Sequence, residues 1–192
     1  MNDIEIKNAT ILDGLGNEPY TGNIYVKDGK IVVITHKETY EASVSLNASG
    51  KIVTPGFIDL HTHSDISFLL DSTAQSKIRQ GVTLELIGNC GLSICAPLIG
   101  DARDMFDTWV SDHTDSYNPD WTDYAGYIEA SKKAKATLNI AFQIGHASLR
   151  LAVMGQDDRS PTADELTEMK RIAGESLDAG ALGFSTGLFY AP

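Results

Sequence analysis

Apolar and polar residues alternate in short stretches along residues 1–54, which predicts β-strands rather than helices. Asp28-Gly29 separates two β-rich runs, at 25–27 and 30–34. This dipeptide is typical of a two-residue hairpin turn, because both of its positions need a positive φ angle. The segment carries no evident chemistry, and we interpret it as part of a small β-domain.

The pattern changes after Pro55-Gly56 into apolar runs that alternate with helical stretches. The first run, 57–61, has no polar face, which is typical of a strand that is covered on both sides. The predicted strands are 57–61, 82–87, 138–144 and 181–185, and the predicted helices are about 72–80, 124–136 and 162–180. Strands that alternate with helices predict parallel βα units, so we divide the chain into domains at 1–54 and 55–192.

The last predicted helix has the clearest local signals. Thr162 and Glu165 form a capping box at its start, and Gly180 stands where a left-handed residue ends a helix. Its predicted buried face consists of Leu166, Met169, Ala173 and Leu177. In contrast, residues 101–123 hold seven aspartates, and we expect them to form an acidic excursion outside the core.

The charge balance narrows the class of protein. The chain has 26 acidic and 15 basic residues, with a net charge of −11. A surface that binds nucleic acid or anionic lipid needs a basic patch, so neither partner is expected. Cys90 and Cys95 cannot build a disulfide framework, and neither a signal peptide nor an apolar run of membrane-spanning length is evident. We expect a cytoplasmic globular protein.

Two histidines stand at the end of the first parallel strand. Side chains alternate faces along a strand, so His61 and His63 point the same way and can converge on one metal ion. Such a pair also arises by chance, but ligands gather at the carboxyl ends of parallel strands. Cys90 ends the second strand within a glycine-rich frame, either as a small buried residue or as a thiolate ligand. A thiolate beside imidazoles favours zinc.

Three further residues are candidates for substrate contact. His146 ends the third strand and Arg150 follows it by four residues. They form either a core histidine with an arginine that caps carbonyls, or a pair that contacts substrate, with Arg150 binding a carboxylate. Tyr190 follows the fourth strand and either lines a pocket or packs. Asp59 could orient a metal ligand, and we expect Asp65 to be an exposed helix cap.

The segment 54–65, Thr-Pro-Gly-Phe-Ile-Asp-Leu-His-Thr-His-Ser-Asp, resembles the first-strand metal motif of the amidohydrolase superfamily. The segments 81–91, 145–155 and 180–188 resemble the N-acyl-D-amino-acid deacylase (D-aminoacylase) family. The Gly-Asn-Cys-Gly element at 88–91 is the discriminating piece. Leu84 and Ala147 depart from the residues more typical of the family, but neither carries a ligand atom.

This resemblance implies an α/β fold, the first half of a (β/α)8 TIM barrel, preceded by a strand segment of a small β-domain. The residues after position 54 are fewer than the about 250 that a complete barrel needs. The implied cofactor is zinc, as one or two ions on His61, His63 and Cys90. The catalytic general acid/base, an aspartate, is expected beyond residue 192, so we assign no catalytic residue within this chain.

The implied reaction is zinc-dependent hydrolysis of the amide bond of N-acyl-D-amino acids, which gives a carboxylate and a D-amino acid. The substrate is a small molecule, and His146, Arg150 and Tyr190 are the expected contacts. We expect the chain to need the C-terminal half of the barrel, to be inactive alone and to self-associate through its open sheet edges. Two alternatives stay open: a cyclic amidohydrolase similar to hydantoinase or dihydroorotase, and a non-catalytic amidohydrolase remnant.

Overall fold

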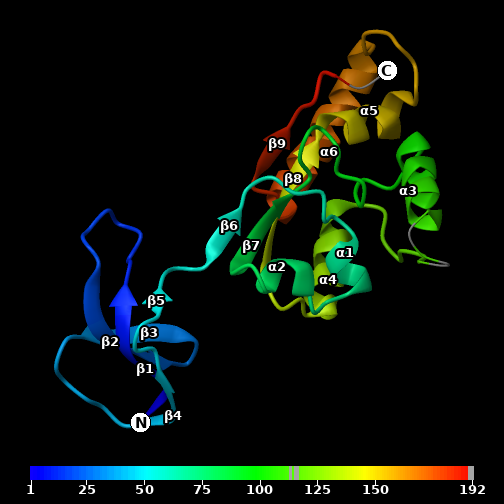
Figure 1. Ribbon diagram of the computed structural model, residues 1–192. Helices are drawn as coiled ribbons and strands as arrows, with labels where there is room; N and C mark the ends of the chain where they lie inside the picture. The colour runs from blue at the N-terminus through cyan, green and yellow to red at the C-terminus, as the bar shows by residue number, and fades with distance from the viewer. Residues whose placement is uncertain (113, 115–116, 190–192) are drawn as a thin grey trace. The chain divides into compact units, whose positions relative to one another are not determined.

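The computed structural model describes residues 1–112, 114 and 117–189, so Tyr190 lies outside the described residues. The chain divides into two compact units, Met1–Gly56 and Phe57–Pro192, which Figure 1 draws in ribbon form. Each unit has its own sheet, and we describe the two units separately.

The first unit is a small mixed sheet. Its strands are β1 (Asn2–Ile11), β2 (Tyr20–Lys27), β3 (Lys30–Thr35), β4 (Ala42–Asn47) and β5 (Ile52–Val53). They lie in the order β3-β2-β1-β4, and the short β5 also pairs with β1. Strand β1 is antiparallel to β2 and parallel to β4 and β5. The expected strand-rich character of this segment is therefore confirmed.

Local turn chemistry sets the register of the hairpin between β2 and β3. Asp28 and Gly29 have φ angles of 51° and 71°, as the Asp-Gly signal predicts. A buried hydrogen bond of 2.6 Å from the Tyr25 hydroxyl to Glu5 Oε1 joins β2 to β1. The small core of this unit consists of Ala9, Ile11, Ile24 and Ala48.

The second unit contains a four-stranded parallel sheet in the order β6-β7-β8-β9. The strands are β6 (Phe57–Asp59), β7 (Val82–Ile87), β8 (Asn139–Gly145) and β9 (Gly183–Ser185). The helices are α1 (Ser67–Leu70), α2 (Gln75–Ile78), α3 (Asp101–Ser111), α4 (Tyr124–Ala134), α5 (His146–Met154) and α6 (Ala163–Ala179). Consecutive parallel strands joined through helices are the successive βα units of a partial (β/α)8 barrel, as the sequence predicts.

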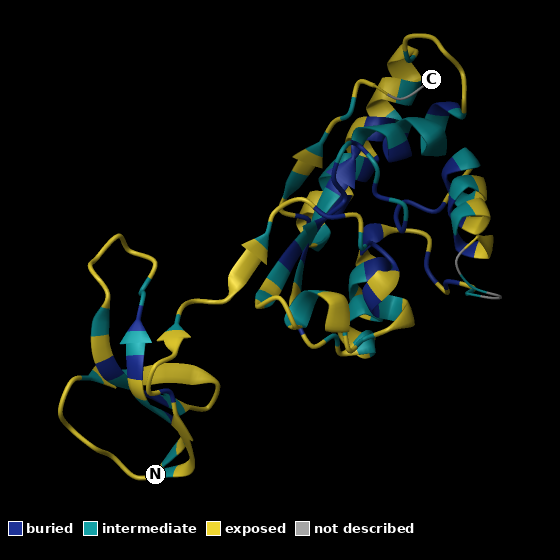
Figure 2. Ribbon diagram, viewed as in Figure 1, coloured by how far each residue is buried: buried dark blue, intermediate teal, exposed yellow. Residues whose placement is uncertain are grey.

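The core of this unit lies between the sheet and its helices, where Figure 2 shows most of the buried residues. Ile87 and Ile144 contribute from the strands, and Phe106, Tyr127 and Met169 contribute from three different helices. Tyr127 is an aromatic hub, because its ring stacks at 5.7 Å on Trp121 and meets Phe142 edge-on at 5.3 Å. The helices are therefore attached to the sheet by one continuous apolar layer.

The expectation that residues 101–123 lie outside the core is wrong. Ala102, Phe106 and Val110 recur at intervals of four, which places them on one face of α3, and all three are buried. Trp121 is also buried, and its indole N–H donates to the Cys95 carbonyl at 2.7 Å. The aspartates of α3, Asp101, Asp104 and Asp107, lie at other positions of the helix, so the number of aspartates in this segment obscured a core helix.

Helix α6 confirms the predicted end signals. Thr162 accepts a hydrogen bond from the Glu165 amide, Glu165 accepts one from the Thr162 amide, and Gly180 ends the helix at φ 118°. The predicted buried face is only partly right, because Leu166 and Leu177 are 41% and 48% exposed. The buried residues of this helix are Met169, Ile172 and Ser176.

Two other helices differ from prediction. The stretch 72–80 contains only the single turn Gln75–Ile78, although Gly81 follows it with the expected left-handed φ of 84°. Helix α5 starts directly at His146, where the sequence indicated only the end of a strand. Its N-terminal amides at Ala147 and Ser148 both donate to the Gly91 carbonyl, a long-range partner that local pattern does not reveal.

Large apolar side chains are exposed on both outer strands of the parallel sheet. Phe57, Ile58 and Leu60 lie on or beside β6, and Leu182 and Phe184 lie on or beside β9. Ile58 is 58% exposed and Leu60 is 65% exposed. Within the described residues, each of these strands has a strand partner on one side only. Among the described helices, none has both the length and the apolar character to span a membrane.

The cap of α6 gives a direct test of this architecture. Replacing Thr162→Ala leaves the Glu165 amide without its side-chain acceptor, so we expect the free energy of unfolding to fall by about 1 kcal/mol. Urea unfolding followed by circular dichroism measures the change. Thr167→Ala, at an exposed position within the same helix, is the control and should be neutral or stabilising. Equal losses in the two variants would contradict the cap.

Candidate metal centre

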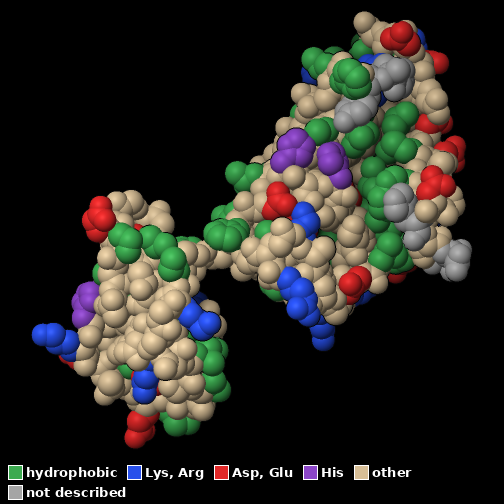
Figure 3. All heavy atoms as spheres, viewed as in Figure 1, with side chains coloured by type: hydrophobic (Ala, Val, Ile, Leu, Met, Phe, Trp, Pro, Cys, Tyr) green, Lys and Arg blue, Asp and Glu red, His purple; other side chains and the backbone are tan. Residues whose placement is uncertain are grey.

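Three side chains converge at the carboxyl edge of the parallel sheet. His61 and His63 follow the end of β6, and Cys90 follows the end of the adjacent strand β7. Their potential ligand atoms all lie within 4.8 Å of one another, and His61 Nε2 is 3.1 Å from Cys90 Sγ. The two imidazole rings are 5.7 Å apart between centroids. Histidine side chains are accessible at the surface of this unit in Figure 3, so a ligand from solvent can reach them.

Cys90 reaches this position through an unusual backbone. Its φ angle is 56°, in the left-handed region, and Gly88 and Gly91 on either side both have φ 79°. A β-carbon on Gly88 would lie 2.2 Å from the Gln143 carbonyl oxygen, and one on Gly91 would lie 2.8 Å from the Gly187 nitrogen. The glycines are therefore required both by their φ angles and by the close approach of neighbouring backbone.

The side chain of Asn89 ties the two ligand-bearing segments together. Its amide nitrogen donates to the Thr62 carbonyl at 3.2 Å and to the Leu86 carbonyl at 2.7 Å. Thr62 lies between the two histidines, so this bond joins the histidine segment to the residue that precedes Cys90. Gln143 on β8 donates to the Asn89 carbonyl oxygen at 3.3 Å, which fixes the orientation of the amide.

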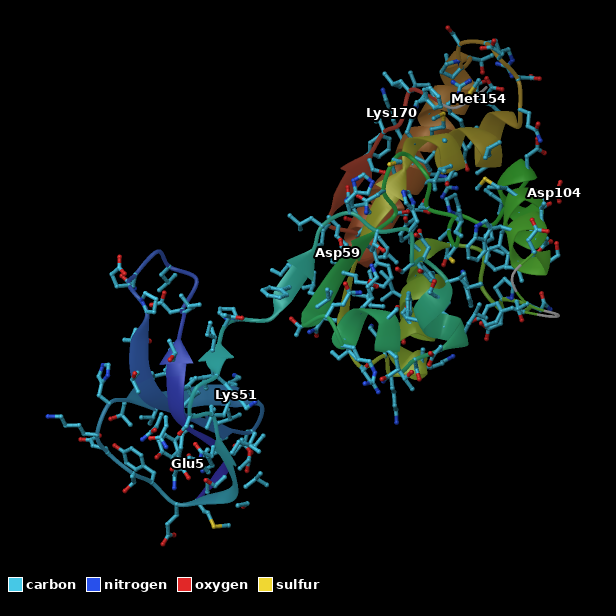
Figure 4. All side chains as sticks on the ribbon, viewed as in Figure 1. Glu5, Lys51, Asp59, Asp104, Met154 and Lys170 are labelled. Atoms are coloured by element: carbon cyan, nitrogen blue, oxygen red, sulfur yellow. The ribbon has the colours of Figure 1, made fainter. Side chains whose placement is uncertain are left out.

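A partly buried ion-pair network lies beneath the histidine segment. Lys77 on α2 contacts Asp59 Oδ2 at 2.8 Å, Glu85 Oε1 at 2.8 Å and the Thr62 hydroxyl at 2.9 Å. Asp59, which Figure 4 labels at the end of β6, accepts the His61 amide on its other oxygen at 3.2 Å. Asp59 thus acts on the backbone of His61 rather than on its ring.

The charges in this network stabilise one another. The hydrogen bond from Lys77 and the His61 amide lower the pKa of Asp59. Burial works to lower the pKa of Lys77, but hydrogen bonds to Asp59 and Glu85 outweigh it and raise that pKa. Glu85 is almost completely buried, so its charge depends on the lysine. Asp59 and Lys77 therefore both stay charged across the neutral pH range.

Asp65 is not an exposed helix cap. It is 3% exposed, and burial raises the pKa of its carboxyl to about 7, against the opposing effect of the Gly88 and Ile94 amides. The Tyr127 hydroxyl donates to its backbone carbonyl. Asp65 belongs to the buried base of the site, beside the turn that carries Cys90.

A second feature of the same edge is a cavity of about 820 Å³, a volume typical of small-molecule sites. It is lined by residues that follow β7, β8 and β9, among them Leu92, His146, Arg150 and Leu188. Arg150 Nη2 donates to the backbone carbonyls of Asp157 and Arg159, at 3.2 and 3.0 Å. Arg150 therefore caps carbonyls, one of its two predicted roles, and also borders the cavity.

His146 lines the same cavity and has an aromatic neighbour on β9. Its ring lies 5.9 Å from that of Phe184. Partial burial and the nearby charge of Arg150 lower the pKa of His146, which keeps the ring neutral near pH 7. A neutral imidazole offers one donor and one acceptor to a bound molecule.

Sequence reasoning missed Lys77, Glu85 and Asn89 as parts of the site. Glu85 carries a signal that could have found it, because a carboxylate inside a covered strand needs a buried cation. Lys77 has no such signal, since a lysine on a short helix is ordinarily solvated. Asn89 stands next to the candidate ligand, but its partners come from other segments.

The donor set suits a zinc ion. Two imidazole nitrogens and one sulfur are borderline-to-soft ligands, which zinc prefers and which calcium and magnesium do not. Donors on one tetrahedral zinc ion lie about 3.5 Å apart, so small side-chain adjustments bring the observed cluster to that spacing. The second requirement of such sites, fixed supports behind the ligands, is met by Asp59 and Asn89.

Known proteins are similar to this chain over nearly its whole length. Over 191 residues the chain is 36% identical to N-acyl-D-glutamate deacylase of Alcaligenes xylosoxydans xylosoxydans, a match that covers 99% of this chain and 38% of that protein. The D-aminoacylase of the same organism is 35% identical over 190 residues, with 99% and 38% covered. The chain therefore spans less than two-fifths of the length of these relatives, and it corresponds to their N-terminal portion.

Solved structures agree with these matches. The N-acyl-D-glutamate deacylase of Bordetella bronchiseptica, complexed with zinc and a phosphonate inhibitor, superimposes with a TM-score of 0.84 at 34% identity, covering 100% of this chain and 39% of that one. The family model for the amidohydrolase family matches residues 45–192, most of the chain and all of its parallel sheet. This chain belongs to the amidohydrolase family.

Proposed function

We propose that this chain forms the N-terminal part of a zinc-dependent deacylase, which hydrolyses the amide bond of N-acyl-D-amino acids to a carboxylate and a D-amino acid. The observation that carries the proposal is the cluster of His61, His63 and Cys90 at adjacent strand ends. The similarity to two N-acyl-D-amino-acid deacylases over nearly the whole chain supports the substrate class.

The chemistry divides between the metal and the residues that hold it. Zinc at this position polarises a scissile carbonyl and lowers the pKa of water. His61 and His63 offer their imidazole nitrogens and Cys90 its sulfur, one or two ions being held in this way. Asp59 orients the histidine segment through the His61 amide. We expect the aspartate that moves the proton to the leaving amine, and further ligands, beyond residue 192.

We place the substrate in the 820 Å³ cavity beside the metal cluster. Leu92 on its wall is two residues from Cys90 in the sequence, which supports a substrate site near the metal ligands. His146, kept neutral, provides hydrogen bonding, and Arg150 provides positive charge for a substrate carboxylate. Tyr190 completes this set of proposed contacts from outside the described residues.

The remaining proposals concern the setting of the enzyme. Both cysteines are free thiols, which supports a reducing compartment and hence the cytoplasm. The exposed apolar side chains on β6 and β9 support a requirement for the C-terminal half of the barrel, or self-association of the isolated chain. The acidic net charge supports a small-molecule substrate without nucleic-acid or membrane partners.

Removal of the thiolate tests the metal assignment. In the full-length protein, Cys90→Ala should lower the bound zinc to well below that of the wild type after dialysis, because one of the soft ligands is lost. Elemental analysis by mass spectrometry measures zinc per chain. Cys95→Ala, at the fully buried second cysteine, is the matched control and should retain its zinc. Wild-type zinc content and activity in Cys90→Ala would refute the assignment of Cys90.

The choice of substrate separates the proposal from a cyclic amidohydrolase. The full-length protein should release free amino acid from N-acetyl-D-amino acids, and it should not open hydantoin or dihydroorotate rings. Amine release and chiral chromatography measure the first reaction, and loss of ring absorbance measures the second. Turnover of the cyclic compounds alone would favour the alternative, and loss of both activities in zinc-loaded protein would favour a non-catalytic remnant.

The isolated chain of residues 1–192 should have no deacylase turnover, because the proposed proton-transferring aspartate lies beyond it. The same amine-release assay, with added zinc, checks this expectation, and the full-length protein is the positive control. Zinc-dependent turnover by residues 1–192 would show that the reacting groups lie within this chain and would overturn our placement of the aspartate.

A further inference from the structure

Ser185, at the end of β9, contacts the turn that carries Cys90 on both sides of the cysteine. Its hydroxyl donates to the Gly88 carbonyl and accepts the Gly91 amide at 3.0 Å. Strand β9 is separated from β7 by the whole of β8, so this serine spans the sheet to reach the turn. One side chain thus fixes the two glycines that bracket Asn89 and Cys90.

The turn needs such an anchor. Cys90 holds a φ angle of 56°, a left-handed conformation that is unfavourable for a residue with a β-carbon. Strained conformations of this kind persist only when the surroundings enforce them. Gly88 and Gly91 are the most flexible of residues and supply no stiffness of their own. The turn has one backbone hydrogen bond of its own, from the Leu92 amide to the Asn89 carbonyl at 2.9 Å, and contacts from other segments must supply the rest.

The turn that carries Cys90 is held from two sides. Asn89 holds the turn to the histidine segment, on the side of β6. On the opposite side, the Gly91 nitrogen and the Gly88 carbonyl meet the Ser185 hydroxyl, and the backbone of Gly187 closes against Gly91. Loss of the serine would leave the Gly91 amide and the Gly88 carbonyl without this partner, although the Gly91 carbonyl would still accept the Ala147 and Ser148 amides. The turn would then be held less firmly, which allows Cys90 to relax toward a negative φ angle and its sulfur to move.

We infer that Ser185 is a positioning residue for the metal centre: its hydroxyl sets the place of the Cys90 sulfur relative to His61 and His63. This inference rests on the proposed function, since it takes Cys90 to be a metal ligand. Ser185 does not touch the metal or the substrate. It acts through the backbone of Gly88 and Gly91, as supports behind metal ligands commonly do.

Cobalt binding to the full-length protein tests the inference, because Co²⁺ reports thiolate ligation by a sulfur-to-metal charge-transfer absorption band. We expect Ser185→Ala to bind Co²⁺ roughly 10–100-fold more weakly and to show a weaker band per bound ion. Ser185→Thr keeps the hydroxyl and should restore most of the affinity and the band. Ser176→Ala removes a buried serine hydroxyl from α6 and should leave both unchanged.

The possible results separate a failure of the proposed metal centre from a failure of the role of Ser185. A wild-type chain that binds Co²⁺ without the charge-transfer band, or not at all, refutes Cys90 as a ligand and with it the proposed centre. A wild-type band that Ser185→Ala leaves unchanged, at unchanged affinity, overturns only the role of Ser185. Equal losses in Ser185→Ala and Ser176→Ala would also overturn it, since they would reflect general destabilisation.

A measurement on the wild-type chain covers the case in which Ser185→Ala does not fold. The Gly91 amide donates to Ser185, so it should exchange with solvent deuterium far more slowly than an amide in an unstructured peptide. Nuclear magnetic resonance resolves this single amide. Exchange at the unstructured rate would show that the anchor does not form and would overturn the inference.

Discussion

The close packing of one glycine-rich turn against two neighbouring strand ends is the constraint on which the candidate site depends. A β-carbon at Gly88 or Gly91 would collide with the backbone of β8 or of the residues after β9. The turn can therefore lie where it does only if both positions are glycine. This packing brings Cys90 over the carboxyl edge of the sheet, next to the histidines that follow β6. The metal centre is in this sense a product of sheet geometry rather than of the ligand residues alone.

The second determinant of the site is the ion-pair network of Lys77, which lies beneath the histidine segment. One lysine, Lys77, joins carboxylates from two adjacent strands, and the buried carboxylate of Glu85 could not be left without a cation except at a penalty of several kcal/mol. The pairing of Asp59 with Glu85 across the parallel register places both on the side that faces α2. A polar base of this kind keeps the strand ends in a single arrangement while the edge above them stays open to solvent.

Local signals were sufficient where one short segment determines the structure. The Asp28-Gly29 turn and the Thr162 cap need only their own neighbours, so the sequence predicted them correctly. Burial of α3 depends on its apolar face, and the many aspartates obscured that face in the sequence. The placing of His61 and Cys90 at shared strand ends followed from the alternation of strands and helices. The roles of Lys77 and Asn89 did not, because they depend on partners in other segments, from 8 residues away for Glu85 to 54 residues away for Gln143.

Thr62, the residue between the two histidines, shows how far these constraints extend. Its carbonyl accepts from Asn89, and its buried hydroxyl meets both Lys77 and the hydroxyl of Ser64. An apolar residue of the same shape would remove both hydroxyl contacts, each worth about 0.5–1.5 kcal/mol, while Lys77 would keep Asp59 and Glu85 and Ser64 would keep Glu85. The middle position of a His-x-His motif is usually written as a wildcard. In this chain the middle position is buried and its hydroxyl is hydrogen-bonded. Its tolerance to mutation is therefore set by hydrogen bonds and not by metal ligation.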